Sequence, residues 1–280
     1  MKWIKFFGSL SVLVTIAATI IISCSESTGP DEREWELVWK DEFNGPAGQL
    51  ADSTKWTPQI GDGSLYGLPP GWGNGQLEYD TGRPENVSLD GEGNLAIVAR
   101  KESFMGRSYT SARIVTQDLF EQTYGRFEAS IKLPWGQGIW PAFWLLGGNF
   151  SEVSWPACGE IDIMEYRGQE PSTVHGTVHG PGYSGANGVT KRYDLPNSRF
   201  DTDFHLFAVE WGTDYIDFFV DDQLYNTITP DDVSGAWVFD HPFFIILNIA
   251  VGGGYVGSPN ESTVFPQTML VDFVRVYEEK

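Results

Sequence analysis

Three acidic side chains lie close together in the segment Gly159–Tyr166, which reads GEIDIMEY. Glu160 and Asp162 are two residues apart, so both would face the same side of a β-strand. Glu165 would face the other side of a regular strand, and one extra residue in a β-bulge would turn it back toward the other two. Three carboxylates on one face repel one another, and this cost is expected at a catalytic site where the environment separates their pKa values.

The pattern favours a hydrolase that works with two carboxyl groups. One ionised carboxylate would act as the nucleophile and one protonated carboxyl as the acid, across the gap of roughly 5 Å that is typical of retaining glycosidases. The spacing alone leaves two other interpretations open, a solvent-facing acidic strand and a calcium site.

Tryptophan residues precede the acidic segment. Trp140 and Trp144 are four residues apart, so on a strand they share one face with Ala142 between them. Indole rings stack on the apolar faces of pyranose rings, so we expect this pair to line a sugar-binding cleft, with core packing as the alternative. Trp135 follows Pro134 in a glycine-rich loop and is expected to line an outer subsite.

His175 and His179 are also four residues apart on a strand-like run, which predicts that they share a face. The pair by itself does not predict zinc, because no third ligand motif accompanies it. His205 lies within an apolar run and His241 precedes a proline, which favours a structural role for the first and a loop position for the second.

From Trp35 onward, apolar and polar residues alternate over short runs separated by Gly, Asn, Asp and Pro. A period of two is typical of β-strands. The pattern predicts hairpins within residues 204–220 and 86–100, and a strand buried on both faces at 243–251. Since no helical period extends over ten residues, we expect about a dozen strands in one antiparallel sandwich or jelly roll.

Composition and charge narrow the classes of function. The 280 residues include 18 Lys and Arg against 38 Asp and Glu, a net charge of −20. The 41% hydrophobic and 14% aromatic content can fill a core and argues against a disordered chain or a helical bundle. An acidic surface repels phosphates, which argues against nucleic acid as a partner. An acidic, tryptophan-rich chain suits a neutral polar ligand such as a sugar.

The N-terminus has the pattern of an export signal. Lys2 and Lys5 precede an uncharged run at 6–23, which ends at Cys24. The residues before Cys24 resemble a bacterial lipobox, where the signal is cleaved and the cysteine is acylated. Cys158 is the only other cysteine, so no disulfide is expected within the body.

These features predict a signal peptide at 1–23, a lipidated tether at 24–34 and a catalytic domain at 35–280. The alternatives for the N-terminus are an uncleaved membrane anchor and a soluble secreted protein in which the cysteine is incidental.

The acidic segment and the tryptophan segment before it resemble glycoside hydrolase family 16, and most of all its bacterial laminarinases, the endo-1,3-β-glucanases. The resemblance extends over about residues 35–277. It implies an all-β, concanavalin A-like β-jelly-roll sandwich with a concave substrate cleft. The matching segments are WKDEFNG (39–45), WGNGQLEY (72–79), RPENVSL (83–89), SARIVT (111–116), GIWPAFWLLG (138–147), GEIDIMEY (159–166), VHGTVHG (174–180), FAVEW (207–211) and FFIILNIAVGG (243–253).

The resemblance also implies roles for individual residues. Glu160 would be the nucleophile, Glu165 the general acid and then the base, and Asp162 a neighbour that tunes both by hydrogen bonding. It implies that His179 donates a hydrogen bond near Glu165. Asn74 and Arg113 match positions that bind sugar hydroxyls on the non-reducing side.

A structural calcium ion is a further implication of the resemblance. Glu42, the carbonyl of Gly93 and Asp272 match a site that many relatives carry on the convex face, with water supplying the remaining ligands. No organic cofactor is expected. The expected partner is a polysaccharide, with no nucleic acid, membrane contact only through the N-terminal lipid, and a monomeric state.

The predicted function is endo-acting, retaining hydrolysis of β-1,3-glucan. In the family, the six-residue form of the acidic motif, which here includes Met164, accompanies β-1,3-glucanases and galactan-cleaving members, and dedicated mixed-linkage enzymes have one residue fewer. Two alternatives remain, hydrolysis of an agar- or carrageenan-type galactan and non-catalytic glucan binding on the same fold.

Overall fold

Strands dominate the part of the chain that the computed structural model describes, Met1 and residues 33–280. Within it, seventeen strands form two sheets, and the only helices are four single 3₁₀ turns. The predicted signal peptide and most of the predicted tether, including Cys24, lie outside the described residues. The 3₁₀ turns are η1 (Ser64–Tyr66), η2 (Gly148–Ser151), η3 (Gly185–Asn187) and η4 (Pro230–Asp232).

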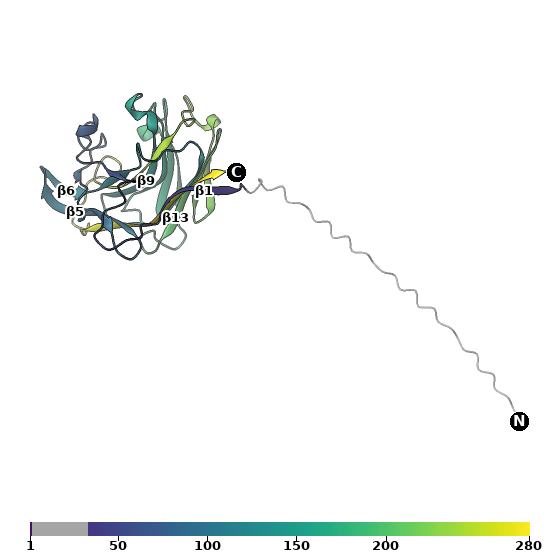
Figure 1. The fold of residues 1–280 in the computed structure, drawn as a ribbon, viewed down its shortest axis with the longest axis horizontal. Helices are drawn as coiled ribbons and strands as arrows, with labels where there is room; N and C mark the ends of the chain where they lie inside the picture. Colours follow the sequence, from purple (N-terminus) through teal and green to yellow (C-terminus); the bar gives the residue numbers. More distant parts are fainter. Residues whose placement is uncertain (2–32) are drawn as a thin grey trace. The chain divides into compact units, whose positions relative to one another are not determined.

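The larger sheet has ten strands in the order β15-β14-β13-β8-β17-β5-β6-β3, with β1 beside β17 and β4 beside β5. Figure 1 shows β5 and β6 side by side, and β1 next to the C-terminus. Its strands are β1 (Trp35–Asp41), β3 (Glu78–Asp80), β4 (Val87–Leu89), β5 (Leu95–Phe104), β6 (Arg107–Ser111), β8 (Gly125–Lys132), β13 (His205–Trp211), β14 (Ile216–Val220), β15 (Gln223–Ile228) and β17 (Gln267–Glu279).

The smaller sheet has seven strands in the order β12-β11-β10-β9-β16-β7-β2, all paired antiparallel. Its central strands β11, β10, β9 and β16 have seven to nine residues each, so they can hold side chains from several strands at fixed positions on one face. Its strands are β2 (Thr57–Pro58), β7 (Arg113–Val115), β9 (Ile139–Gly147), β10 (Glu160–Tyr166), β11 (Thr173–His179), β12 (Val189–Asp194) and β16 (Phe243–Val251).

One hydrophobic cluster fills the space between the two sheets. Phe143 and Ile161 enter it from the smaller sheet and Phe127 and Phe207 from the larger one, and all four side chains are fully buried. Alternate residues of each strand therefore supply the core, as period-two patterning requires. The predicted antiparallel sandwich is confirmed.

The predicted local elements also agree with the structure. β13 pairs with β14 and β4 with β5, as the hairpin predictions require, and every residue of β16 is buried. The prediction of about a dozen strands was too low, because strands such as β2, β3 and β7 have only two or three residues each. Such short runs carry too few alternations for a periodicity to be seen.

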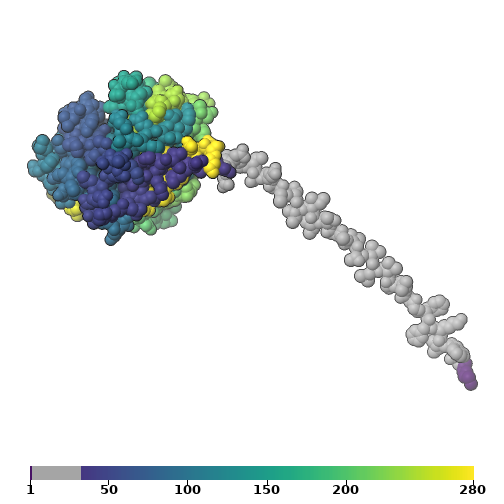
Figure 2. All heavy atoms as spheres, in the orientation of Figure 1, coloured from purple at the N-terminus to yellow at the C-terminus, as the bar shows by residue number. Residues whose placement is uncertain are grey.

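The two ends of the described body meet at the surface. Strand β1 pairs with the end of β17, and the space-filling view shows the two segments in contact (Figure 2). Among residues 33–280, no helix has the length and apolar character that a membrane crossing needs.

A close backbone contact fixes the start of the acidic strand. The amide of Gly147 donates to the carbonyl of Gly159 over 3.1 Å, just before Glu160. A methyl group at Gly147 would lie 1.9 Å from the carbonyl oxygen of Cys158 and 2.7 Å from Nε2 of His241. Only glycine allows β9 and the segment before β10 to approach this closely.

We expect Gly147→Ala to lower the free energy of unfolding by about 2 kcal/mol or more, because the added methyl group displaces backbone rather than a flexible side chain. Urea unfolding followed by fluorescence measures this change. Gly254→Ala is the matched control, since its nearest neighbour would be the Asn74 carbonyl oxygen at 3.9 Å. Equal stability of the two variants would contradict the prediction.

Candidate active site

A β-bulge in β10 brings the three acids to one side of the smaller sheet. Opposite β11, Asp162 pairs with Thr177 and Glu165 with His175, so three steps along β10 match two along β11. The register against β9 shifts at the same place, between Asp162 and Met164. This is the extra residue that the sequence analysis required for Glu165 to share a face with the other acids.

Burial shows which side chains the bulge turns inward. Ile163 and Met164 are consecutive, yet they are 1% and 0% exposed and both belong to the core. Glu165 follows them and is only partly buried, so it lies on the opposite side, away from the core. The acids therefore occupy the outer face of the sheet.

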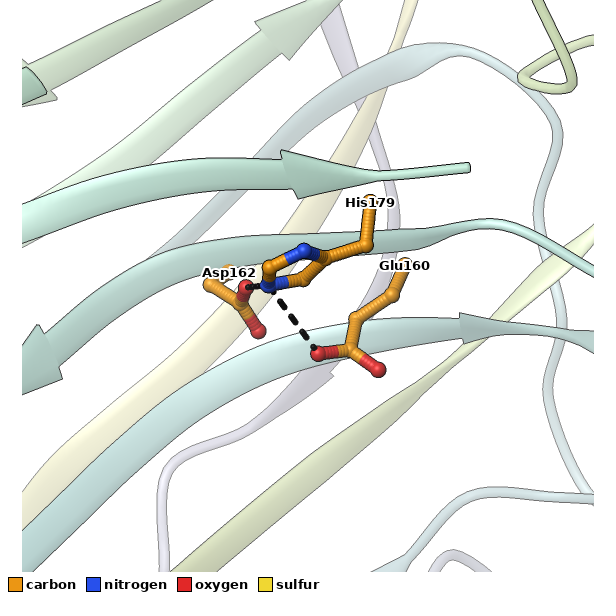
Figure 3. A group of neighbouring side chains, drawn as sticks. All are labelled: Glu160, Asp162 and His179. Atoms are coloured by element: carbon orange, nitrogen blue, oxygen red, sulfur yellow. Dashed lines mark ion pairs between the residues drawn. The ribbon is translucent and has the colours of Figure 1, made fainter. Parts of the chain in front are cut away.

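His179 closes the acidic group from the neighbouring strand. It is the cross-strand partner of Glu160, and its Nε2 lies 3.2 Å from Oδ2 of Asp162 and 3.7 Å from Oε1 of Glu160. Figure 3 shows the imidazole directed at both carboxylates. The structure places His179 against Asp162 and Glu160, and its expected role as a hydrogen-bond donor near Glu165 stays a prediction. His175 lies two positions away and pairs with Glu165 instead.

Burial makes the charges of this group interdependent. It raises the pKa of Glu160 to about 8, with a further increase from the neighbouring charge of Asp162. Burial and the charge of Glu165 also raise the pKa of Asp162 well above its usual range. Asp162 and Glu160 lie close together and each affects the pKa of the other, so their ionisation is a property of the pair.

Burial likewise raises the pKa of Glu165 to about 7, against opposing effects of His179 and of a hydrogen bond from Trp140. The family resemblance predicts an ionised Glu160 beside a protonated Glu165. Burial raises the pKa values of all three carboxyls, so which of them is ionised depends on the whole group, and the expected assignment stays a prediction.

Trp140 and Trp144 both face the acids' side of the sheet and are partly exposed. Nε1 of Trp140 donates to Oε1 of Glu165 over 3.1 Å. Nε1 of Trp144 donates to Oδ1 of Asn248 over 2.8 Å. Both indoles thus have polar partners on the site's face, and Trp144 also packs against a hydrophobic cluster that includes Leu146 and Phe244. Their role in lining a sugar-binding cleft stays a prediction.

Arg113 lies between two indole rings. Its guanidinium carbon is 4.4 Å from the ring of Trp72 and 4.7 Å from that of Trp144, and the residue is buried. Burial lowers the pKa of Arg113 to about 10, and the charges of Asp80 and Glu160 oppose this shift. The arginine therefore stays charged at neutral pH, near the end of the acidic group that holds Glu160.

The other predicted sugar-binding residues lie at the rim. Asn74 is exposed, and its carbonyl accepts from the amide of Gly254 over 3.0 Å. Trp135 is 45% exposed, and its ring lies 5.2 Å from the guanidinium carbon of Arg199. The structure gives Trp135 a contact with this arginine and not with the acidic group, so its role as an outer subsite stays a prediction.

Three aromatic residues and one amide belong to this region although the sequence analysis assigned them no role. Asn248 could have been found, because it is the one polar residue in the apolar run of β16. The aromatics gave no such local signal, because their neighbours come from distant segments. They are Trp72 beside Arg113, Trp155 at 6.1 Å from the His179 ring, and Tyr255 at 4.9 Å from the Trp140 ring.

Two places among the described residues offer ligands for a metal. The first is the acidic group with its histidine. Each of Glu160, Asp162 and His179 offers one ligand atom, and these atoms lie within 4.8 Å of one another, so the group could also hold a cation. The residues of the predicted calcium site belong to the larger sheet or its turns. Asp272 is exposed at a bulge of β17, and the Glu42 carboxylate is bound by Arg275 over 2.9 Å.

Residues 72–274 match the family described as Glycosyl hydrolases family 16. A β-glucanase of Rhodothermus marinus is 41% identical over 273 residues, which cover 92% of both chains. Among solved structures, the laminarinase catalytic domain of Thermotoga maritima superposes with a TM-score of 0.83 at 48% identity and covers 88% of this chain and 99% of that one. The endo-β-1,3-glucanase of Pyrococcus furiosus gives a TM-score of 0.84 at 48% identity, with 89% and 97% coverage.

The match includes the bulged acidic strand, the tryptophans before it and the histidine beside it, and it extends over most of both sheets. This chain belongs to glycoside hydrolase family 16 and has its β-jelly-roll fold.

Proposed function

We propose that this protein is an endo-acting, retaining hydrolase of β-1,3-glucans such as laminarin. The observation that carries the proposal is the placement of Glu160, Asp162 and Glu165 on one face by the bulge of β10. The laminarinases of similar sequence and structure support β-1,3-glucan as the substrate.

In the proposed mechanism each group has one task. Glu160, ionised while the neighbouring Asp162 holds a proton, attacks the anomeric carbon and forms a covalent glycosyl-enzyme. Glu165, whose raised pKa keeps a large share protonated at neutral pH, gives its proton to the leaving oxygen. It then takes a proton from the water that releases the product. Two displacements retain the anomeric configuration.

The surroundings fit a neutral sugar chain. The partly exposed rings of Trp140 and Trp144 give flat apolar faces for pyranose rings, and Arg113 beside Trp144 gives a fixed donor for hydroxyls. We expect outer sugar units to contact Asn74 and Trp135 at the rim.

Glu160→Gln should lower the rate of reducing-end release from laminarin by roughly a thousandfold or more, because it removes the nucleophile. Glu165→Gln should lose activity on laminarin but keep the first step on an activated aryl glucoside, with azide trapped as a glycosyl azide. Glu278→Gln, at an exposed position of β17, is the matched control and should keep wild-type activity. Laminarin activity retained by Glu160→Gln would refute the mechanism.

Product analysis on laminarin, mixed-linkage glucan and agarose decides the substrate. Short β-1,3-linked oligosaccharides from laminarin support the proposal. Products from agarose alone would establish the galactan alternative, and binding to laminarin without products would establish the non-catalytic one.

We also propose that one calcium ion binds at the larger sheet. The carboxylate of Glu42 does not fit as a ligand, because Arg275 and Lys40 hold it in ion pairs. The donors of this proposal are the exposed carboxylate of Asp272, the carbonyls of Glu42 and Gly93, and water.

Calcium should raise the unfolding temperature of the wild-type protein by several degrees over that in EDTA, since binding to the folded state alone stabilises it. Asp272→Asn should remove this difference, and Asp240→Asn, an exposed aspartate elsewhere, should keep it. Thermal unfolding followed by circular dichroism measures both. A wild-type protein insensitive to calcium would show that the site is not used.

Export and anchoring through the acylated Cys24 complete the proposal, supported by the charge and apolar pattern of residues 1–24. Metabolic labelling with a fatty acid should mark the wild-type protein in the membrane fraction, and Cys24→Ala should abolish the label. Cys158→Ala, at a fully buried cysteine, should leave it unchanged. Uncleaved, membrane-bound Cys24→Ala protein would indicate a helical anchor, and unlabelled wild-type protein in the medium would indicate simple secretion.

A further inference from the structure

A turn and a loop from distant parts of the chain close over the end of β10 that holds Glu165. The turn is 167–170, and the loop is 252–257. The side-chain amides of Gln169 and Gln137 both donate to the carbonyl of Val256, over 3.1 and 2.6 Å. Gln169 thus fixes the loop to the turn, and Gln137 fixes it to the segment before β9.

Within this closure, a series of ring contacts leads from Arg167 to the acid/base carboxyl. The guanidinium carbon of Arg167 lies 4.2 Å above the ring of Tyr255, and Tyr255 lies 4.9 Å from the ring of Trp140. Nε1 of Trp140 donates to Glu165. Each contact limits the freedom of the next side chain, because moving away from the ring loses the attraction of the cation or of the neighbouring ring.

Arg167 also carries the positive charge of this corner. Its side chain is about one third exposed, and Nη1 lies 3.4 Å from Oε1 of Glu170. Arg167 lowers the pKa of Glu165, whereas burial and the charge of Glu160 raise it. Burial and Arg167 also lower the pKa of His175, which therefore remains neutral. The titratable groups around Glu165 are Glu160 and Asp162 on β10, His175 and His179 on β11, Arg167 and Glu170 on the turn, and Tyr255 on the loop.

We propose that Arg167 is a positioning residue for the acid/base Glu165, which it serves by stacking on Tyr255 and by placing a cation beside the carboxyl. The stack holds the indole that hydrogen-bonds to Glu165. The cation limits the effect of burial, so that the carboxyl can give up its proton in the first displacement and accept one in the second. The inference rests on the proposed role of Glu165.

Because Arg167 is charged, it affects the ionisation of Glu165, which a residue with a packing role alone would not do. Removing the positive charge disfavours the carboxylate form, so the pKa of Glu165 rises. The protonated acid then persists to higher pH, and the alkaline limb of kcat/KM moves upward.

Arg167→Gln should move that limb upward by about half a unit to one unit, and should lower kcat because the carboxyl gives up its proton less readily in the first displacement. Arg167→Lys keeps the positive charge but loses the planar stack. The alkaline limb of kcat/KM for this variant should therefore lie close to its wild-type position. Arg192→Gln is the matched control. Arg192 lies opposite His175 on β12, is 69% exposed and pairs with Asp194, so its removal should leave the limb in place.

A second measurement does not depend on turnover. ¹³C NMR of carboxyl-labelled glutamate, with the Glu165 signal assigned from its loss in Glu165→Gln, gives the titration of the free protein. An upward shift in Arg167→Gln and its reversal in Arg167→Lys support the inference even if the hydrolysed glycan proves to differ. An unmoved titration in a folded Arg167→Gln variant, or an equal shift in Arg192→Gln, would overturn it. If Arg167→Gln does not fold, Tyr255→Leu tests the stack: an unchanged kcat would overturn it.

Discussion

One extra residue in β10 is the feature on which the site depends. Without the register shift between Asp162 and Glu165, the second glutamate would face the core and its charge would be buried among apolar side chains. The bulge turns Ile163 and Met164 inward together and turns Glu165 outward. The antiparallel pairing with β9 and β11 continues on both sides of it, so the distortion is confined to the place where chemistry requires it.

Burial and charge oppose each other across this face. Burial raises the pKa values of Glu160, Asp162 and Glu165, which favours protons on the site. The hydrogen bond from Trp140 and the cations around the acids act in the other direction. Arg113 near Glu160 and Arg167 near Glu165 are both held by stacking on aromatic rings. Each of the two glutamates therefore has an arginine near it that contacts an aromatic ring.

The sandwich supplies the rigidity that this balance needs. β16 is buried along its full length beside β9, and Gly147 lets the backbone before β10 approach β9 closely. The larger sheet contacts the other face of the core and carries the residues of the proposed calcium site. The acidic group and the proposed calcium site thus belong to opposite sheets of one core.

The sequence by itself determined much of this protein. Period-two alternation identified the strands around Ile131 and Phe218, the spacing of Glu160, Asp162 and Glu165 indicated paired-carboxylate chemistry, and the need for a bulge followed from parity. These inferences succeed because strand periodicity is a local property of the chain.

Only the tertiary structure decided which groups meet. The contact of His179 with Asp162, the place of Arg113 between Trp72 and Trp144, and the packing of Tyr255 on Trp140 all join segments that are far apart in sequence. The order of the carboxyl pKa values depends on the same contacts and on burial. Their physical basis is the register of strand pairing and the exclusion of water, and neither can be derived from the spacing of residues along one strand.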